Sequence, residues 1–119
     1  KNLNIYKLGL VFSLLSATAA FAAEEFNIVT KSKDNEMNNK MMTMKLSEAE
    51  TLNDSTFWQT VNNHFKIMEK GYTLQSEYWE DRPDFPIDFS EPAYQGLLKR
   101  VKNSPSVLTL VFEVEATKK

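Results

Sequence analysis

Hydrophobic and polar side chains alternate along four short stretches of the chain, a pattern typical of strands that bury one face. In residues 107–115 (VLTLVFEVE) every second side chain from Leu108 onward is apolar. In residues 72–79 (YTLQSEYW) the aromatic side chains favour a strand whose even-numbered residues share one face and whose odd-numbered residues share the other. Weaker alternation predicts two more strands, at 26–29 and 42–46, joined by a polar loop.

Between the second and third of these strands, apolar residues recur at helical spacing. The predicted apolar stripe consists of Phe57, Val61, Phe65 and Met68. Thr56 and Gln59 have the spacing of a capping box, and Gly71 can supply the left-handed residue that ends a helix. A second capping-box spacing, Ser47 and Glu50, predicts a short helical turn ahead of this helix.

A second helix is predicted after residue 90. Ser90 can cap its N-terminus, and Pro92 falls in its first turn, where proline is tolerated. The apolar stripe comprises Tyr94, Leu97, Leu98 and Val101. The order of elements is therefore β-β-α-β-α-β, which predicts a single small α+β domain with a sheet of about four strands and two helices on one face. A strand-helix-strand passage that makes a right-handed crossover would place two strands parallel, so the sheet would then be mixed.

The N-terminal segment predicts export. Lys1 and Lys7 precede an apolar run that closes on the small-x-small sequence Ala20-Phe21-Ala22. This is the pattern of a secretory signal peptide, and the run is shorter than a membrane-spanning helix requires. We therefore expect residues 1–22 to be a cleaved signal peptide, residues 23–119 to form the domain, and the mature protein to be periplasmic or secreted without stable membrane insertion.

The composition of the chain argues against several classes of function. Removing residues 1–22 leaves 12 basic and 16 acidic residues, a formal charge of −4, so nucleic acid is not the expected partner. The chain has no Cys, one His and three Gly. No nucleophile elbow, phosphate-cradling loop or usual zinc set occurs, so we expect neither enzymatic activity nor a cofactor.

One stretch stands out as a candidate binding surface: residues 77–92 (EYWEDRPDFPIDFSEP) combine carboxylates, aromatics and three prolines. Prolines stiffen a loop, and rigid aromatics ringed by charge are typical of protein interfaces. The predicted partner-binding residues are Trp79, Asp81, Asp84, Phe85 and Asp88. These observations favour a protein-binding domain, of the inhibitor or immunity type, that occludes a partner with a basic contact surface. The alternative for this stretch is a lid whose aromatics turn inward to close the core.

A cluster of methionines gives a second functional hypothesis. Met37, Met41, Met42 and Met44 lie within eight residues, and His64 is the single imidazole. Thioethers select Cu(I), so a periplasmic Cu(I) or Ag(I) carrier is an alternative function. Methionines also fill gaps in cores, which is the competing structural explanation. A third possibility is an envelope structural or stress protein without a discrete site.

Overall fold

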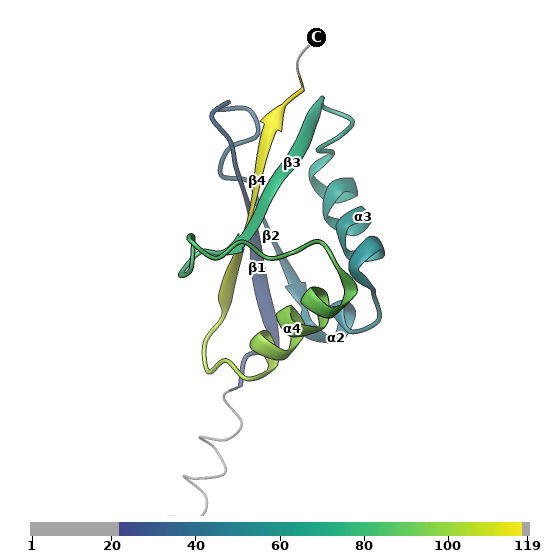
Figure 1. Ribbon diagram of the computed structural model, residues 1–119, viewed down its shortest axis with the longest axis vertical. Helices are drawn as coiled ribbons and strands as arrows, with labels where there is room; N and C mark the ends of the chain where they lie inside the picture. Colours follow the sequence, from purple (N-terminus) through teal and green to yellow (C-terminus); the bar gives the residue numbers. More distant parts are fainter. Residues whose placement is uncertain (1–21, 118–119) are drawn as a thin grey trace, which may run out of the picture.

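The computed structural model describes residues 22–117, which form one mixed four-stranded sheet covered by helices (Figure 1). The strands are β1 (Glu25–Lys31), β2 (Met41–Lys45), β3 (Tyr72–Trp79) and β4 (Leu108–Ala116). The helices within these residues are α2 (Leu46–Ala49), α3 (Asp54–Phe65) and α4 (Glu91–Lys102). The predicted α+β class and β-β-α-β-α-β order are thus confirmed, and α2 forms where a short helical turn was predicted ahead of α3. The predicted signal peptide at 1–22 lies outside the described residues except for Ala22.

The sheet has the strand order β2-β1-β4-β3. β1 pairs antiparallel with β2 and parallel with β4, and β4 pairs antiparallel with β3. The two central strands carry most of the apolar inner face, because Phe26, Ile28 and Thr30 of β1 lie beside Leu108, Leu110 and Phe112 of β4. The sheet is therefore mixed, as the crossover argument allowed.

Aromatic packing joins the helices to this inner face. The Phe57 ring of α3 lies 6.3 Å from Phe26, 5.0 Å from Tyr94 and 6.0 Å from Phe112, measured between ring centroids. The Trp58 ring stacks on Phe112 with the centroids 6.0 Å apart. Phe57 thus contacts two strands and α4 at once, which places it at the centre of the core.

Both long helices begin at side-chain caps, although the first capping box differs from the predicted one. Asn53 is the N-cap of α3: its side chain accepts a hydrogen bond from the Thr56 N–H at 2.9 Å, while Thr56 Oγ1 accepts one from the Asn53 N–H at 2.8 Å. The Ser47 capping box does not form, because the N-cap of α2 is Lys45 without a side-chain hydrogen bond. Ser90 caps α4, as predicted, by accepting from the Ala93 N–H.

The prediction that the α3 stripe continues to Met68 was wrong. The helix ends at Phe65 because Lys66 adopts the left-handed conformation, with φ 59°, and Asn62 Oδ1 accepts a hydrogen bond from the Met68 N–H. The chain then turns so that Ile67 is fully buried while Met68 is 60% exposed. Gly71, with φ 86°, completes the turn into β3 rather than ending the helix.

Replacing Phe57 by Ala tests its central place in the core. We expect the free energy of unfolding to fall by about 3–5 kcal/mol, because removal of the large ring leaves a cavity between two strands and two helices. Urea denaturation at neutral pH measures this change. Phe89→Ala is the matched control: Phe89 is 57% exposed, so its loss should change the stability by less than about 1 kcal/mol. Equal effects of the two substitutions would contradict the central position of Phe57.

Candidate functional site

The loop between β3 and α4, residues 80–90, contains most of the predicted contact residues, but the first of these, Trp79, lies in the core. Its side chain is only 6% exposed and meets Phe26 edge-on with the ring centroids 6.4 Å apart. The guanidinium carbon of Arg100 lies 5.2 Å from the centre of the Trp79 ring, a cation–π distance. Trp79 therefore packs inward, as the alternative of a lid over the core predicts, and its ring is not available to a partner.

Asp81 is also engaged within the molecule. Its carboxylate forms two hydrogen bonds with the Arg100 guanidinium, at 2.6 and 3.1 Å. These bonds hold the pKa of Asp81 below its usual range. Both partners are partly or largely exposed, so the pair adds little stability, but its two-pronged geometry fixes the start of the loop against α4.

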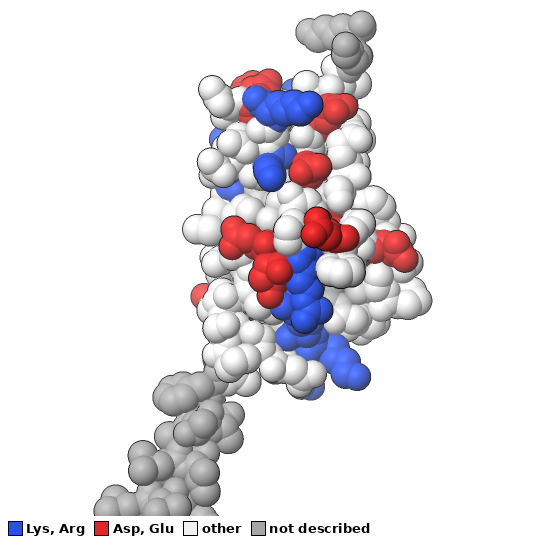
Figure 2. All heavy atoms as spheres, turned by 60° about the vertical axis from the view of Figure 1, so that its left-hand side comes forward, with Lys and Arg blue, Asp and Glu red and all other residues white. Residues whose placement is uncertain are grey.

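The remaining predicted residues, Asp84, Phe85 and Asp88, are exposed. Phe85 is 72% exposed, and neighbouring Phe89, which the sequence did not single out as a contact residue, is 57% exposed. Among the residues that the structure describes, Asp84 and Asp88 form no ion pair. We call Asp84, Phe85, Asp88 and Phe89 the exposed loop set. Figure 2 views the side to which the loop tip projects in Figure 1, and carboxylates gather there at mid-height beside Lys and Arg side chains.

Backbone hydrogen bonds hold this loop in one path. The N–H of Arg82 donates to the Trp79 carbonyl at 2.8 Å, and the N–H of Phe85 donates to the Arg82 carbonyl at 3.1 Å. Farther on, the N–H of Ile87 donates to the Glu77 carbonyl at 2.7 Å, and Ile87 packs against the core. The loop therefore covers part of the free edge of β3 and presents its exposed aromatics from an ordered backbone.

The structure does not gather the methionine cluster into one site. Met37 and Met44 are fully buried, and Met41 is 60% exposed. Met41 and Met42 are adjacent on β2, so their side chains point to opposite faces of the sheet, and Met42 packs against the core. His64 is exposed on α3, where its ring meets that of Phe65. Metal binding by these residues would require the core to open.

A buried carboxyl group, which the sequence did not single out, lies on the inner face of the sheet at Glu77. The pairing of β3 with β4 shifts register between Leu74 and Ser76, so Glu77 lies opposite Phe112 and Tyr78 lies opposite Val111. Regular alternation had predicted the even-numbered residues of β3 on one face throughout. The extra residue, Gln75, instead turns Glu77 inward beneath α3, and β-bulges often re-aim side chains in this way.

Glu77 lines a hollow of about 410 Å³ between β3, the start of α3 and the loop. Glu77 is only 7% exposed, and its carboxyl group, which forms no hydrogen bond with another described residue, contacts solvent only through the hollow. Burial raises the pKa of Glu77 to about 8, and the negative charge of Asp54 adds to this effect. Burial and the nearby Glu91 carboxylate also raise the pKa of Asp54. At neutral pH Glu77 is therefore mainly protonated, and a carboxyl group with so perturbed a pKa in a hollow is a candidate functional residue.

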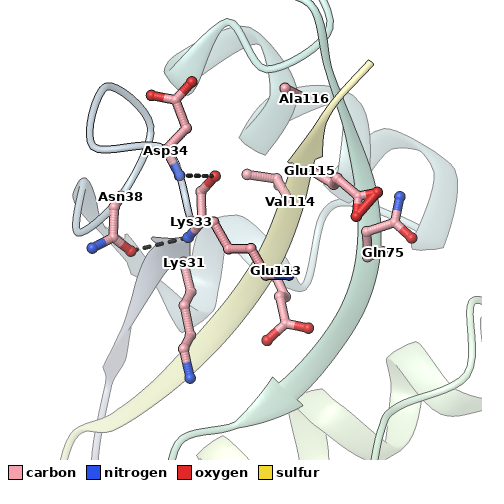
Figure 3. A pocket seen from close by; sticks show the side chains of 10 residues that line it. Lys31, Lys33, Asp34, Asn38, Gln75, Glu113, Val114, Glu115 and Ala116 are labelled. Atoms are coloured by element: carbon pink, nitrogen blue, oxygen red, sulfur yellow. Dashed lines mark hydrogen bonds between the residues drawn. The ribbon is translucent and has the colours of Figure 1, made fainter. Parts of the chain in front are cut away.

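A second hollow, of about 450 Å³, opens at one end of the sheet beside the β1–β2 loop (Figure 3). Asn38 Oδ1 accepts a hydrogen bond from the Ser32 N–H at 2.9 Å, and Ser32 Oγ accepts one from the Asp34 N–H at 3.1 Å. Its charged lining is mixed: Lys31, Lys33, Asp34, Glu113 and Glu115. Since both signs of charge are present in its lining, this hollow favours no particular ligand.

Among residues 22–117, no three or more His, Cys, Asp or Glu side chains are grouped so that they could hold a metal ion. None of the helices in this range has the length and apolar character of a membrane span. Comparisons with known protein families, characterised proteins and solved structures find no match, so a functional assignment depends on the geometry of the sites.

The buried Glu77 predicts a distinct dependence of stability on pH. The folded protein keeps the proton up to a pKa of about 8, whereas the unfolded chain loses it near 4.5. The contribution of Glu77 to stability is thus complete below pH 4.5 and is lost as the pH rises to 8, by up to about 1.4 kcal/mol per pH unit. Glu77→Gln removes this loss, so its stability relative to the wild type should increase steadily over that range. Urea denaturation from pH 4 to 9 measures the difference.

Glu115→Gln is the control for this experiment, because Glu115 is an exposed carboxylate on the neighbouring strand. Its stability curve should run parallel to that of the wild type. Parallel curves for Glu77→Gln and the wild type would show that Glu77 is ionised in the folded protein at neutral pH.

Proposed function

We propose that this protein is an exported binding domain that captures a basic surface of another protein through the exposed loop set. The observation that carries the proposal is the exposure of Phe85, at 72%, on a loop whose backbone is fixed on both sides. A loop normally loses backbone entropy when a partner orders it. Here the backbone hydrogen bonds and two prolines, Pro83 and Pro86, reduce that loss.

Charge favours a basic partner. Asp84 and Asp88 flank Phe85 and form no ion pair among the described residues, so their charges are available to a partner. Aromatic anchors supply most of the affinity in such interfaces, while surrounding charges speed association and select the partner. Asp81 and Trp79 then have a supporting role, because they fix the loop to Arg100 from behind.

The proposal also includes export of the protein and inhibition of its partner. Export is supported by the pattern of residues 1–22, which predicts a periplasmic or secreted protein. A small acidic domain with one projecting loop suits an inhibitor or immunity-type protein that covers a partner's active site. We do not favour the metal carrier, because Met37 and Met44 are buried and Met41 points to the other face of the sheet.

Substituting the loop tests the proposed interface. The triple variant Asp84→Asn/Phe85→Ala/Asp88→Asn should retain the wild-type stability, because all three side chains are exposed. Its affinity for the partner recovered from an envelope extract should fall at least tenfold, since an aromatic anchor alone contributes about 1.4 kcal/mol or more. Capture on immobilised protein, followed by titration of the identified partner, measures the loss.

The matched control changes one apolar and two acidic side chains away from the loop: Met68→Ala/Glu69→Gln/Glu115→Gln. All three side chains are exposed, and Met68 is 60% exposed. The control should bind as the wild type does, and binding by the wild type should weaken as salt rises. Equal loss in both variants, or no loss in the loop variant, would contradict an interface at the exposed loop set.

A further inference from the structure

We propose that the hollow at Glu77 is a binding site for an alkylammonium cation, either a lysine side chain of another protein or a free primary amine. Two carboxyl groups, Glu77 and Asp54, line it together with the aromatic rings of Phe57, Trp58 and Phe89. No Lys, Arg or His is among the lining residues. The site thus combines acidic groups with aromatic surface, which is the usual environment of bound ammonium groups.

The first argument is the missing partner of Glu77. A buried polar group is normally satisfied by a hydrogen bond, and a carboxyl group that is not remains costly to the fold. Glu77 is only 7% exposed, and no hydrogen bond joins its carboxyl group to another described residue, so solvent that enters the hollow is what its oxygens contact. A ligand with N–H donors, positioned in the hollow, would satisfy it.

The second argument is the shape and lining of the hollow. Its volume of about 410 Å³ falls within the roughly 300–1,000 Å³ of typical ligand sites. Trp58 is half-buried and Phe89 is 57% exposed, so both offer aromatic surface at the opening, while Leu74 adds an apolar side chain. An alkyl stem can lie against this surface with its charged end at the carboxyl groups.

A metal ion fits the hollow less well than an ammonium group does. Calcium takes about six to eight oxygen ligands and magnesium a full octahedron, whereas the side chains of this hollow offer two carboxyl groups, the Ser55 hydroxyl and apolar carbon. Within residues 22–117 there is also no cluster of three or more potential metal-ligating side chains of the His, Cys, Asp or Glu type. The lining therefore selects a cation that also has an apolar stem.

Binding of such a cation would be coupled to loss of a proton. Because the pKa of Glu77 is raised to about 8, its carboxyl group is mainly protonated at pH 7 when the site is free, and a bound ammonium group would favour the ionised carboxylate. The other titratable groups near it are Asp54 of α3 and Glu91 of α4, whose Oε1 accepts from the Asp54 N–H at 2.8 Å, and Tyr94, which lies near both. Affinity should therefore rise severalfold between pH 6 and 8.5, while an alkylamine stays protonated.

The test is a titration of the protein with n-butylammonium chloride. NMR monitors binding through the chemical shifts of the Trp58 indole N–H and the Glu77 amide. 1-Butanol is the neutral probe of similar shape. We expect n-butylammonium to bind at least tenfold more tightly than 1-butanol at pH 8.5, and Glu77→Gln to remove that preference. Glu115→Gln should leave it intact. Equal binding of the two probes, or an unchanged preference in Glu77→Gln, would overturn the proposal.

Further arms of the experiment identify the source of the cation and guard against a folding defect. Tighter binding of the peptide acetyl-Gly-Lys-Gly-amide than of n-butylammonium would support a protein lysine, and the reverse order would support a free amine. If Glu77→Gln does not fold, the pH dependence in the wild type decides: affinity for n-butylammonium that does not change between pH 6 and 8.5 would overturn the proposal. The result can be separated from the loop interface, because none of the probes requires Asp84, Phe85 or Asp88 and only Phe89 is shared with the exposed loop set.

Discussion

The register shift at Gln75 is the constraint on which both candidate sites depend. Before the shift, Leu74 lies opposite Val114 on the inner face, and after it the inner positions of β3 are Glu77 and Trp79. A regular strand would have placed Ser76 and Tyr78 there. One additional residue in an edge strand thus brings a carboxyl group under α3 and an indole against the core, and it moves Tyr78 to the outer face, where its hydroxyl donates to Glu113 Oε2 at 3.1 Å.

The inward Trp79 in turn positions the loop. Arg100 of α4 lies over the Trp79 ring and reaches Asp81 with two hydrogen bonds, so the residues that leave β3 are tied to the helix that follows the loop. Farther along the loop, the Ile87 N–H donates a hydrogen bond to the Glu77 carbonyl, which holds the loop against the edge of β3. Phe85 and Phe89 are exposed because the positions nearest the core are already occupied by Trp79 and Ile87, which leaves the other aromatics of the loop at the surface.

The sequence predicted the order of elements because the apolar periodicity of most segments matches their burial; Tyr94, Leu97, Leu98 and Val101 of α4 are all buried. It did not predict the end of α3 at Lys66, since a left-handed lysine has no distinctive sequence pattern. It also missed Glu77 and misplaced Trp79, because a single-residue register shift depends on pairing with β4. Spacing within β3 alone does not contain that information.

Glu77 also shows why the two sites belong to one region of the molecule. Gln at this position would avoid the cost of a buried ionisable group, so stability alone does not account for a carboxyl group there. Phe89 belongs to both the exposed loop set and the lining of the hollow. A basic protein segment bound along Asp84, Phe85 and Asp88 would therefore pass the opening of the hollow, and one of its lysines could reach Glu77. In that arrangement the loop provides the exposed aromatic anchor, and the hollow binds a single positive charge beside Glu77 and Asp54.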